Sequence, residues 1–202
     1  MVTAAPNLDG EARIDLRQAR VLCADETTQG LEILGQILMG FGVQTIVRAQ
    51  SGEDFRRTLG QQAFDLILVD GGLGGNGFEF IQWLRHSSIE INRYTATVAL
   101  SGHTPRTQVE LARDCGANFV VIKPVSPATL LDRVMWVGRT ARMFVESETY
   151  VGPDRRFKNT GVPVGTKGRR KGDLSADVGE AVDPNMSQDD IDNLMKPNRV
   201  AL

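Results

Sequence analysis

The sequence predicts an α/β fold in which helices cover both faces of a five-stranded parallel sheet. Between residues 20 and 145, short apolar runs alternate with segments that carry apolar residues at helical spacing, and such alternation is typical of a parallel sheet. The apolar runs are nearly continuous, as expected for strands buried on both faces. For five strands, the flavodoxin-like, doubly wound order 2-1-3-4-5 is the simplest arrangement.

The predicted strands are rich in aliphatic residues and stop at polar or glycine residues. They cover residues 21–24, 43–47, 65–69, 96–100 and 119–122. The predicted helices have apolar residues three or four positions apart. They cover residues 28–40, 78–85 and 107–114, with two more that begin at 51 and 126. Ser51 and Asp54 resemble a capping box, and Pro127 suits the first position of the last helix.

The composition is that of an average soluble protein and excludes several classes. The chain has 202 residues, 41% hydrophobic and 24% charged, with a net charge of −2, which does not favour a nucleic-acid-binding protein. Cys23 and Cys115 are too few for a disulfide framework. We expect a cytoplasmic protein without a membrane span or signal peptide, because no apolar run is long enough for either.

The charge pattern divides the chain into unequal parts. From residue 155 to 171 there are seven basic residues and no acid, and from 173 to 192 there are seven acids and no base. Such segments bury too little apolar surface to fold alone. We therefore expect a flexible arm (1–18), the α/β domain (19–146), a basic then acidic linker (147–185), a short amphipathic helix (186–196) and a C-terminus (197–202).

Polar residues follow four of the five predicted strands. Asp25 and Glu26 follow the first strand, Asp70 the third, Ser101 the fourth and Lys123 the fifth. The carboxyl ends of parallel strands meet at one edge of the sheet. Converging carboxylates favour a bound Mg²⁺, and a lysine with a hydroxyl suits an attached phosphoryl group. This pattern predicts aspartyl-phosphate chemistry.

The same residues, with Lys123-Pro124 after the fifth strand and Gly116-Ala117 before it, resemble the receiver domains of two-component response regulators over residues 20–145. The resemblance implies that Asp70 accepts the phosphoryl group, that Ser101 and Lys123 contact it, and that the Lys123–Pro124 peptide bond is cis. It also implies four groups that hold Mg²⁺: Asp25, Glu26, Asp70 and the backbone carbonyl of Gly72.

The loop after Asp70 departs from the family pattern. It is one residue shorter than usual and lacks the usual proline, and Val120 stands where many receivers carry a switching aromatic residue. The loop also spells G-x-G-x-x-G between Gly72 and Gly77. A dinucleotide loop would follow the first strand and need an acid about 20 residues later. Neither condition is met, so we do not predict a dinucleotide site.

The C-terminal helical segment resembles the N-terminal, receiver-binding peptide of flagellar switch proteins. The match is Ser-Gln-Asp-Asp-Ile-Asp-Asn-Leu-Met, although a generic capped amphipathic helix would look similar. The candidate partner-binding residues are Ser187, Gln188, Ile191, Leu194 and Met195. The basic stretch carries two arginine pairs, Arg155-Arg156 and Arg169-Arg170, which fit either a solvated linker or an arm for anionic ligands.

These observations predict a response regulator rather than an enzyme. Asp70 would receive a phosphoryl group from a histidine kinase or phosphotransfer protein, with Mg²⁺ as cofactor. The output would be a protein contact, for example in chemotaxis or motility, because no helix-turn-helix pattern follows the domain. The helical segment could dock within the chain or on a second copy. The alternatives are a phosphorylation-independent scaffold and a phosphorelay intermediary.

Overall fold

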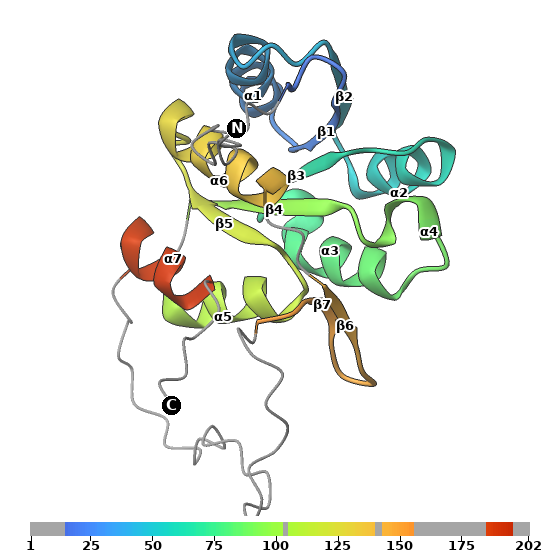
Figure 1. Ribbon diagram of the computed structural model, residues 1–202, viewed down its shortest axis with the longest axis vertical. Helices are drawn as coiled ribbons and strands as arrows, with labels where there is room; N and C mark the ends of the chain where they lie inside the picture. The colour runs from blue at the N-terminus through green and yellow to red at the C-terminus, as the bar shows by residue number, and fades with distance from the viewer. Residues whose placement is uncertain (1–14, 103–104, 140–142, 156–184, 196–202) are drawn as a thin grey trace, which may run out of the picture.

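A parallel sheet in the order β2-β1-β3-β4-β5 forms the centre of the computed structural model (Figure 1). Its strands are β1 (Arg20–Ala24), β2 (Thr45–Ala49), β3 (Leu66–Asp70), β4 (Ala96–Ser101) and β5 (Phe119–Ile122). The structure describes residues 15–102, 105–139, 143–155 and 185–195. The predicted fold class and strand order are confirmed, and β5 lies at one edge of the sheet.

Helices cover both faces of the sheet, as Figure 1 shows. One face carries α1 (Thr28–Gly40) and α6 (Pro127–Arg139), and the other carries α2 (Gly52–Gln61), α3 (Gly77–His86) and α5 (Arg106–Asp114). A short helix α4 (Glu90–Arg93) and a 3-10 turn η1 (Leu73–Gly75) lie in the connections. The Ser51 hydroxyl accepts a hydrogen bond from the Asp54 N–H at 3.1 Å and caps α2.

The sheet interior is almost entirely apolar, with the buried Thr97 as an exception, and this explains why its strands could be recognised from the sequence. Ile67, Leu68 and Val98 are 0% exposed. The second strand begins two residues later than predicted, at Thr45. The reason is that the N–H of Val43 bonds to the carbonyl of Leu38 at 3.1 Å, which makes residue 43 part of the turn after α1.

An antiparallel hairpin follows the last helix of the domain. It consists of β6 (Phe144–Glu146) and β7 (Val151–Pro153). The boundary that we predicted at residue 146 coincides with the end of β6, inside this hairpin. The hairpin packs closely on the turn before β5, because a Cβ atom at Gly116 would lie 2.4 Å from the carbonyl oxygen of Val151.

Arg85 ties this region together from inside the domain. Its guanidinium is fully buried and donates to the carbonyls of Gly116, Arg93 and Thr95 at 2.6–3.0 Å and to Oδ1 of Asn118 at 3.2 Å. Its charge also lies 5.0 Å from the centroid of the Phe144 ring in the hairpin. Burial lowers the pKa of Arg85 to about 10, and backbone carbonyls take the place of a carboxylate partner.

The predicted C-terminal helix is present as α7 (Gln188–Met195) and lies beside β5 (Figure 1). Within the parts of the chain that the structure describes, no helix combines the length and apolarity needed to cross a membrane. The arm at residues 1–14, most of the predicted linker (156–184) and the C-terminus from 196 lie outside the described residues.

Candidate functional site

Asp25, Asp70 and Lys123 meet at the carboxyl ends of β1, β3 and β5. Nζ of Lys123 lies 2.7 Å from Oδ2 of Asp25 and 2.6 Å from Oδ1 of Asp70. The Asp25 side chain is 1% exposed, whereas that of Asp70 is 16% exposed. The parallel register places these strand ends side by side, so one ammonium group bridges two carboxylates, of which Asp70 is the accessible one.

Hydrogen bonds keep the buried carboxylate ionised. Burial would raise the pKa of Asp25, but hydrogen bonds from Lys123 and Thr27 outweigh it and leave this pKa below its ordinary value. Thr27 donates its backbone N–H and its hydroxyl to Oδ1 of Asp25 at 2.9 and 2.7 Å. Burial would lower the pKa of Lys123, but its two carboxylate partners raise it. Both members of this pair are therefore charged at neutral pH.

The glycine-rich loop after β3 orients the Asp70 carboxylate. The N–H of Gly72 donates to Oδ2 of Asp70 at 3.0 Å, which leaves Oδ1 to Lys123. The loop closes through a 2.8 Å hydrogen bond from the N–H of Gly77 to the carbonyl of Gly71. It is also tied to the first strand end, because the N–H of Gly74 donates to Oε1 of Glu26 at 2.6 Å.

Three glycines are required by the shape of this loop. Gly74 and Gly75 have φ angles of 60° and 85°, in the left-handed region that favours glycine. At Gly77 a Cβ atom would lie only 1.9 Å from the backbone oxygen of Asp70. The glycine pattern therefore builds a tight turn beneath Asp70 and makes no nucleotide loop.

An open pocket of about 550 Å³ lies over the accessible carboxylate. Asp70, Ser101 and Lys123 line it together with Asn76 and Gln108. The backbone N–H of Lys123 donates to the carbonyl of Ser101 at 2.9 Å, so the ends of β4 and β5 are held together. The arrangement can hold a small anion between a hydroxyl and an ammonium group, directly beside a carboxylate.

Comparison with known families identifies this arrangement. The family model of the response regulator receiver domain matches residues 21–135, which is more than half of the chain and includes Asp25, Asp70, Ser101 and Lys123. The chain belongs to the response regulator receiver family.

Two known bacterial sensory proteins resemble the chain over part of their length. The sensory/regulatory protein RpfC of Xanthomonas campestris is 26% identical over 147 residues, and the virulence sensor protein BvgS of Bordetella bronchiseptica is 29% identical over 119 residues. These matches cover 72% and 57% of this chain. The chain spans only 20% of RpfC and 10% of BvgS.

Solved receivers share the fold over nearly their whole length. The chemotaxis response regulator CheY4 of Vibrio cholerae is 25% identical with a TM-score of 0.53, covering 59% of this chain and 98% of that one. A CheY-like receiver domain protein of Methanospirillum hungatei is 22% identical with a TM-score of 0.51, covering 57% and 90%. The second similarity supports the fold alone.

The receiver brings together two of the four groups expected at the metal. Asp25 and Asp70 converge, but the Glu26 carboxylate, one methylene longer, reaches the N–H of Gly74. The Gly72 carbonyl accepts from the N–H of Gly75 at 2.9 Å and keeps one lone pair. Among the described residues, no three His, Cys, Asp or Glu side chains gather as metal ligands. The expected convergence of three carboxylates is therefore not found, and the Mg²⁺ ligands stay a prediction.

Two other features implied by the receiver resemblance can be located. The peptide bond between Lys123 and Pro124 is cis. Val120 is buried, and its neighbour Phe119 points to α6, where its ring meets Trp136 edge-on at 4.7 Å. The position of the switching aromatic residue is thus filled by an aliphatic side chain within the core.

The predicted partner-binding helix contacts the receiver itself. The Gln188 amide spans two residues of the edge strand: Nε2 donates to the carbonyl of Val120 at 3.0 Å, and the N–H of Ile122 donates to Oε1 at 3.0 Å. An ion pair joins Asp192 of α7 to Arg133 of α6. We call the surface formed by Val120, Ile122 and Arg133 the β5–α6 face.

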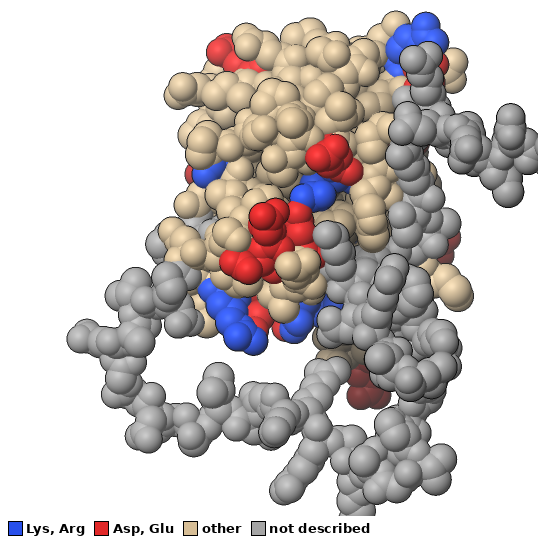
Figure 2. All heavy atoms as spheres, turned by 60° about the vertical axis from the view of Figure 1, so that its left-hand side comes forward, with Lys and Arg blue, Asp and Glu red and all other residues tan. Residues whose placement is uncertain are grey.

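The remaining predicted residues of α7 have separate roles. Ile191 and Met195 are 0% and 3% exposed, and Leu194 packs beside them against the core. Ser187 caps the helix by accepting from the N–H of Asp190 at 3.2 Å. Figure 2 turns this side of the molecule toward the viewer and shows acidic side chains gathered beside basic ones. The helix therefore uses one apolar and one polar set of contacts.

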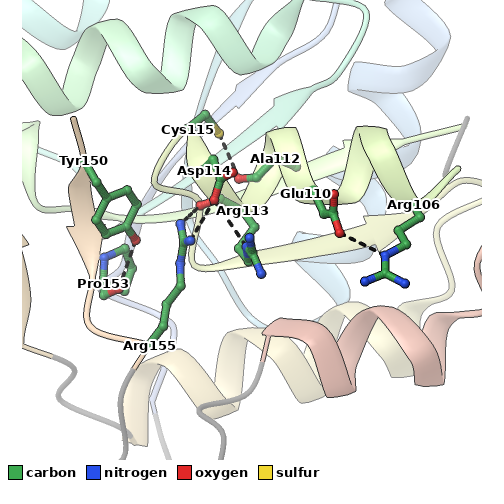
Figure 3. A network of polar contacts seen from close by, with 9 residues as sticks. All are labelled: Arg106, Glu110, Ala112, Arg113, Asp114, Cys115, Tyr150, Pro153 and Arg155. Carbon is green, nitrogen blue, oxygen red and sulfur yellow. Dashed lines mark hydrogen bonds and ion pairs between the residues drawn. The ribbon is translucent and has the colours of Figure 1, made fainter. Parts of the chain in front are cut away.

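Arg155 is the one member of the two arginine pairs that the structure describes, since Arg156, Arg169 and Arg170 lie outside the described residues. Arg155 bonds to Asp114 at 2.8 Å and to the carbonyl of Arg113, both at the end of α5 (Figure 3). Its guanidinium also lies 4.2 Å from the centroid of the Tyr150 ring. These contacts make Arg155 an anchor of the hairpin.

Sequence reasoning missed Arg133 and the direction of Glu26. Arg133 lies among the apolar residues Leu130 and Val134 of the last helix, where one basic residue gives no signal of its partner. Its ion pair with Asp192 bridges 59 positions. A charge pair over such a separation can be recognised only after the fold has placed α7 on the sheet edge.

Proposed function

We propose that this receiver accepts a phosphoryl group on Asp70 from the phosphohistidine of a histidine kinase or a phosphotransfer protein. The supporting observation is that Asp70 alone of the two paired carboxylates opens onto the pocket. A carboxylate oxygen of Asp70 bonds to phosphorus as the bond from phosphorus to the donor imidazole nitrogen breaks. The departing imidazole takes up a proton.

The neighbouring side chains would stabilise the transferred group. Lys123 would pair with a phosphoryl oxygen while keeping Asp25 neutralised, and the Ser101 hydroxyl would donate to another oxygen. The carboxylates of Asp25 and Asp70 are suited to bind a cation, because both already form ion pairs with the ammonium group of Lys123. Mg²⁺ would be held by Asp25, Asp70 and the carbonyl of Gly72, and it would neutralise charge on the phosphoryl oxygens.

Intact mass spectrometry tests the proposal directly. The full chain is incubated with acetyl phosphate and Mg²⁺, and the expected product carries one additional phosphoryl group. Asp70→Asn should gain none, whereas Asp65→Asn, an acid at the opposite end of β3, should react like the wild type. No adduct at any Mg²⁺ concentration would favour the phosphorylation-independent scaffold.

We further propose that the receiver acts in the cytoplasm by protein contact, without an enzymatic or DNA-binding output. The helix α7, with its likeness to the switch peptide, lies on the β5–α6 face, and the similar CheY4 is a chemotaxis regulator. We therefore propose motility as the process in which the receiver acts. A pulldown of flagellar switch protein by the full chain tests it, and absence of binding with and without acetyl phosphate would contradict it.

A phosphorelay intermediary is the second candidate, because RpfC and BvgS are a sensory/regulatory protein and a sensor protein. In that case the phosphoryl group on Asp70 would pass to a histidine of another protein. Transfer to a purified histidine phosphotransfer protein, followed on a phosphate-affinity gel, separates this function from output through the β5–α6 face.

A further inference from the structure

The helix α7 makes specific contacts with the domain, but it is a short element held by a small set of them. The contacts that hold it include two hydrogen bonds of Gln188, an ion pair, and the buried side chains of Ile191 and Met195. A helix of eight residues is marginal in isolation. Within the described structure, the buried Nε of Arg133 has no hydrogen-bond partner, which costs about 1–3 kcal/mol. The short length of α7 and this unpaired donor favour reversible docking.

The helix is also tethered to the surface that it covers. Residues 156–184 connect the hairpin to α7, so docking is an intramolecular event. A similar helix from another protein must therefore compete with the tethered α7, whose effective concentration at the β5–α6 face is high. Because α7 covers Ile122 and Arg133, both ligands cannot occupy the face together.

The covered strand leads directly into the phosphorylation site. Ile122, which donates to Gln188, precedes Lys123, and Lys123 contacts both Asp25 and Asp70. The amide of Gln188 fits the spacing of Val120 and Ile122 when Asp70 is unmodified. A phosphoryl group that draws Lys123 toward it moves the adjoining N–H of Ile122 and weakens this two-point contact.

We propose that α7 is a tethered inhibitor, which covers the β5–α6 face while Asp70 is unmodified and leaves it when Asp70 is phosphorylated. The release rests on the proposed function, whereas the covering of the face does not. By linkage, docking of α7 opposes phosphorylation to the same degree as phosphorylation opposes docking.

The covering is tested with a fluorescein-labelled peptide of the α7 sequence added to the full chain, and anisotropy gives its Kd. A face that is covered nine-tenths of the time weakens apparent binding about tenfold. Gln188→Ala combined with Ile191→Ala should therefore bind the peptide about tenfold more tightly than the wild type. Asp189→Ala, at an exposed position of α7, should match the wild type.

Equal affinity of the wild type and the double variant, or no binding by either, would overturn the covering. Circular dichroism checks that the double variant keeps its fold. Arg133→Ala in the double-variant background should weaken binding of the peptide again, since Asp192 of the peptide then lacks its ion-pair partner.

The release is tested by adding beryllofluoride and Mg²⁺, a stable mimic of the phosphorylated carboxylate. The double variant should then bind the peptide about tenfold more weakly than without beryllofluoride, because the moved N–H of Ile122 weakens the same two-point contact with the peptide. Adding Asp70→Asn to the double variant should abolish this response. If acetyl phosphate labels Asp70 but beryllofluoride leaves the affinity unchanged, release is wrong and the proposed function stands. If no adduct forms, the release fails together with the proposed function.

Discussion

Replacing Gly77 with alanine should damage both the fold and the reactivity of Asp70. The new Cβ atom would lie 1.9 Å from the backbone oxygen of Asp70, and real Cβ contacts are essentially never shorter than 3.0 Å. The loop and the strand must therefore separate by about 1.1 Å. The three atoms nearest to this Cβ all belong to the backbone of Asp70 and Gly71, so the strain cannot be relieved by a rotamer change.

The magnitude follows from two losses. Overpacking against backbone costs about 1–3 kcal/mol, and the hydrogen bond from Gly77 to Gly71 contributes about 1 kcal/mol. The free energy of unfolding should fall by about 2–4 kcal/mol, which lowers the urea midpoint by about 1–2 M. Because the strained atom belongs to Asp70, phosphorylation by acetyl phosphate should slow by about tenfold to a hundredfold.

Gly60→Ala is the matched control for this experiment. Gly60 lies in α2, and a Cβ atom added there would meet nothing outside its own stretch of helix within 4 Å. Alanine at this position should therefore stabilise the chain by about 0.5–1 kcal/mol. Urea denaturation and intact mass are measured on both variants. A Gly77→Ala chain with the wild-type urea midpoint and the wild-type phosphorylation rate would refute the reasoning.

Three further predictions concern other parts of the domain. Arg85→Met should lower the free energy of unfolding by about 2–4 kcal/mol, because four buried or partly buried acceptors lose the hydrogen bond that Arg85 donates. The exposed Arg57→Met should change it by at most about 0.5 kcal/mol in urea denaturation. Burial raises the pKa of Cys23 and Cys115 from 9.0 to about 12, so unfolded thiols lose protons before folded ones. The free energy of unfolding should fall as pH rises above about 9, by up to about 1.4 kcal/mol per pH unit for each thiol. If the urea midpoint of a chain with both cysteines changed to alanine falls equally over this pH range, the prediction is wrong. Arg155→Ala should speed amide hydrogen exchange in the hairpin and leave the phosphorylation rate unchanged, and unchanged exchange would remove Arg155 as its anchor.

Much of the sheet could be predicted because burial on both faces forces continuous apolar runs, and the polar residues that end them are conspicuous. Asp25, Asp70 and Lys123 could therefore be grouped from strand order alone. That Glu26 joins them as a metal ligand stays a prediction. Its carboxylate is bound by a loop N–H 48 positions away, and the shape of that loop depends on left-handed glycines at 74 and 75.

The hairpin could not be predicted for a different reason. Its strands have three residues each, and the residues between them are polar. Their stability comes from Arg85 and from the contact between Gly116 and Val151, which depend on the folded receiver. Local sequence preference carries no information about either contact. The same holds for Gln188, whose amide finds its partners on a strand 66 positions away.

The position of Gln188 has a consequence for solubility. β5 ends the sheet, and an uncovered edge strand offers its backbone groups as a template for another chain. By bonding to Val120 and Ile122, the glutamine amide imitates a neighbouring strand and blocks that template without extending it. A chain that loses α7 gains a partner surface and an aggregation site together, so truncated forms should precipitate where the full chain stays dispersed.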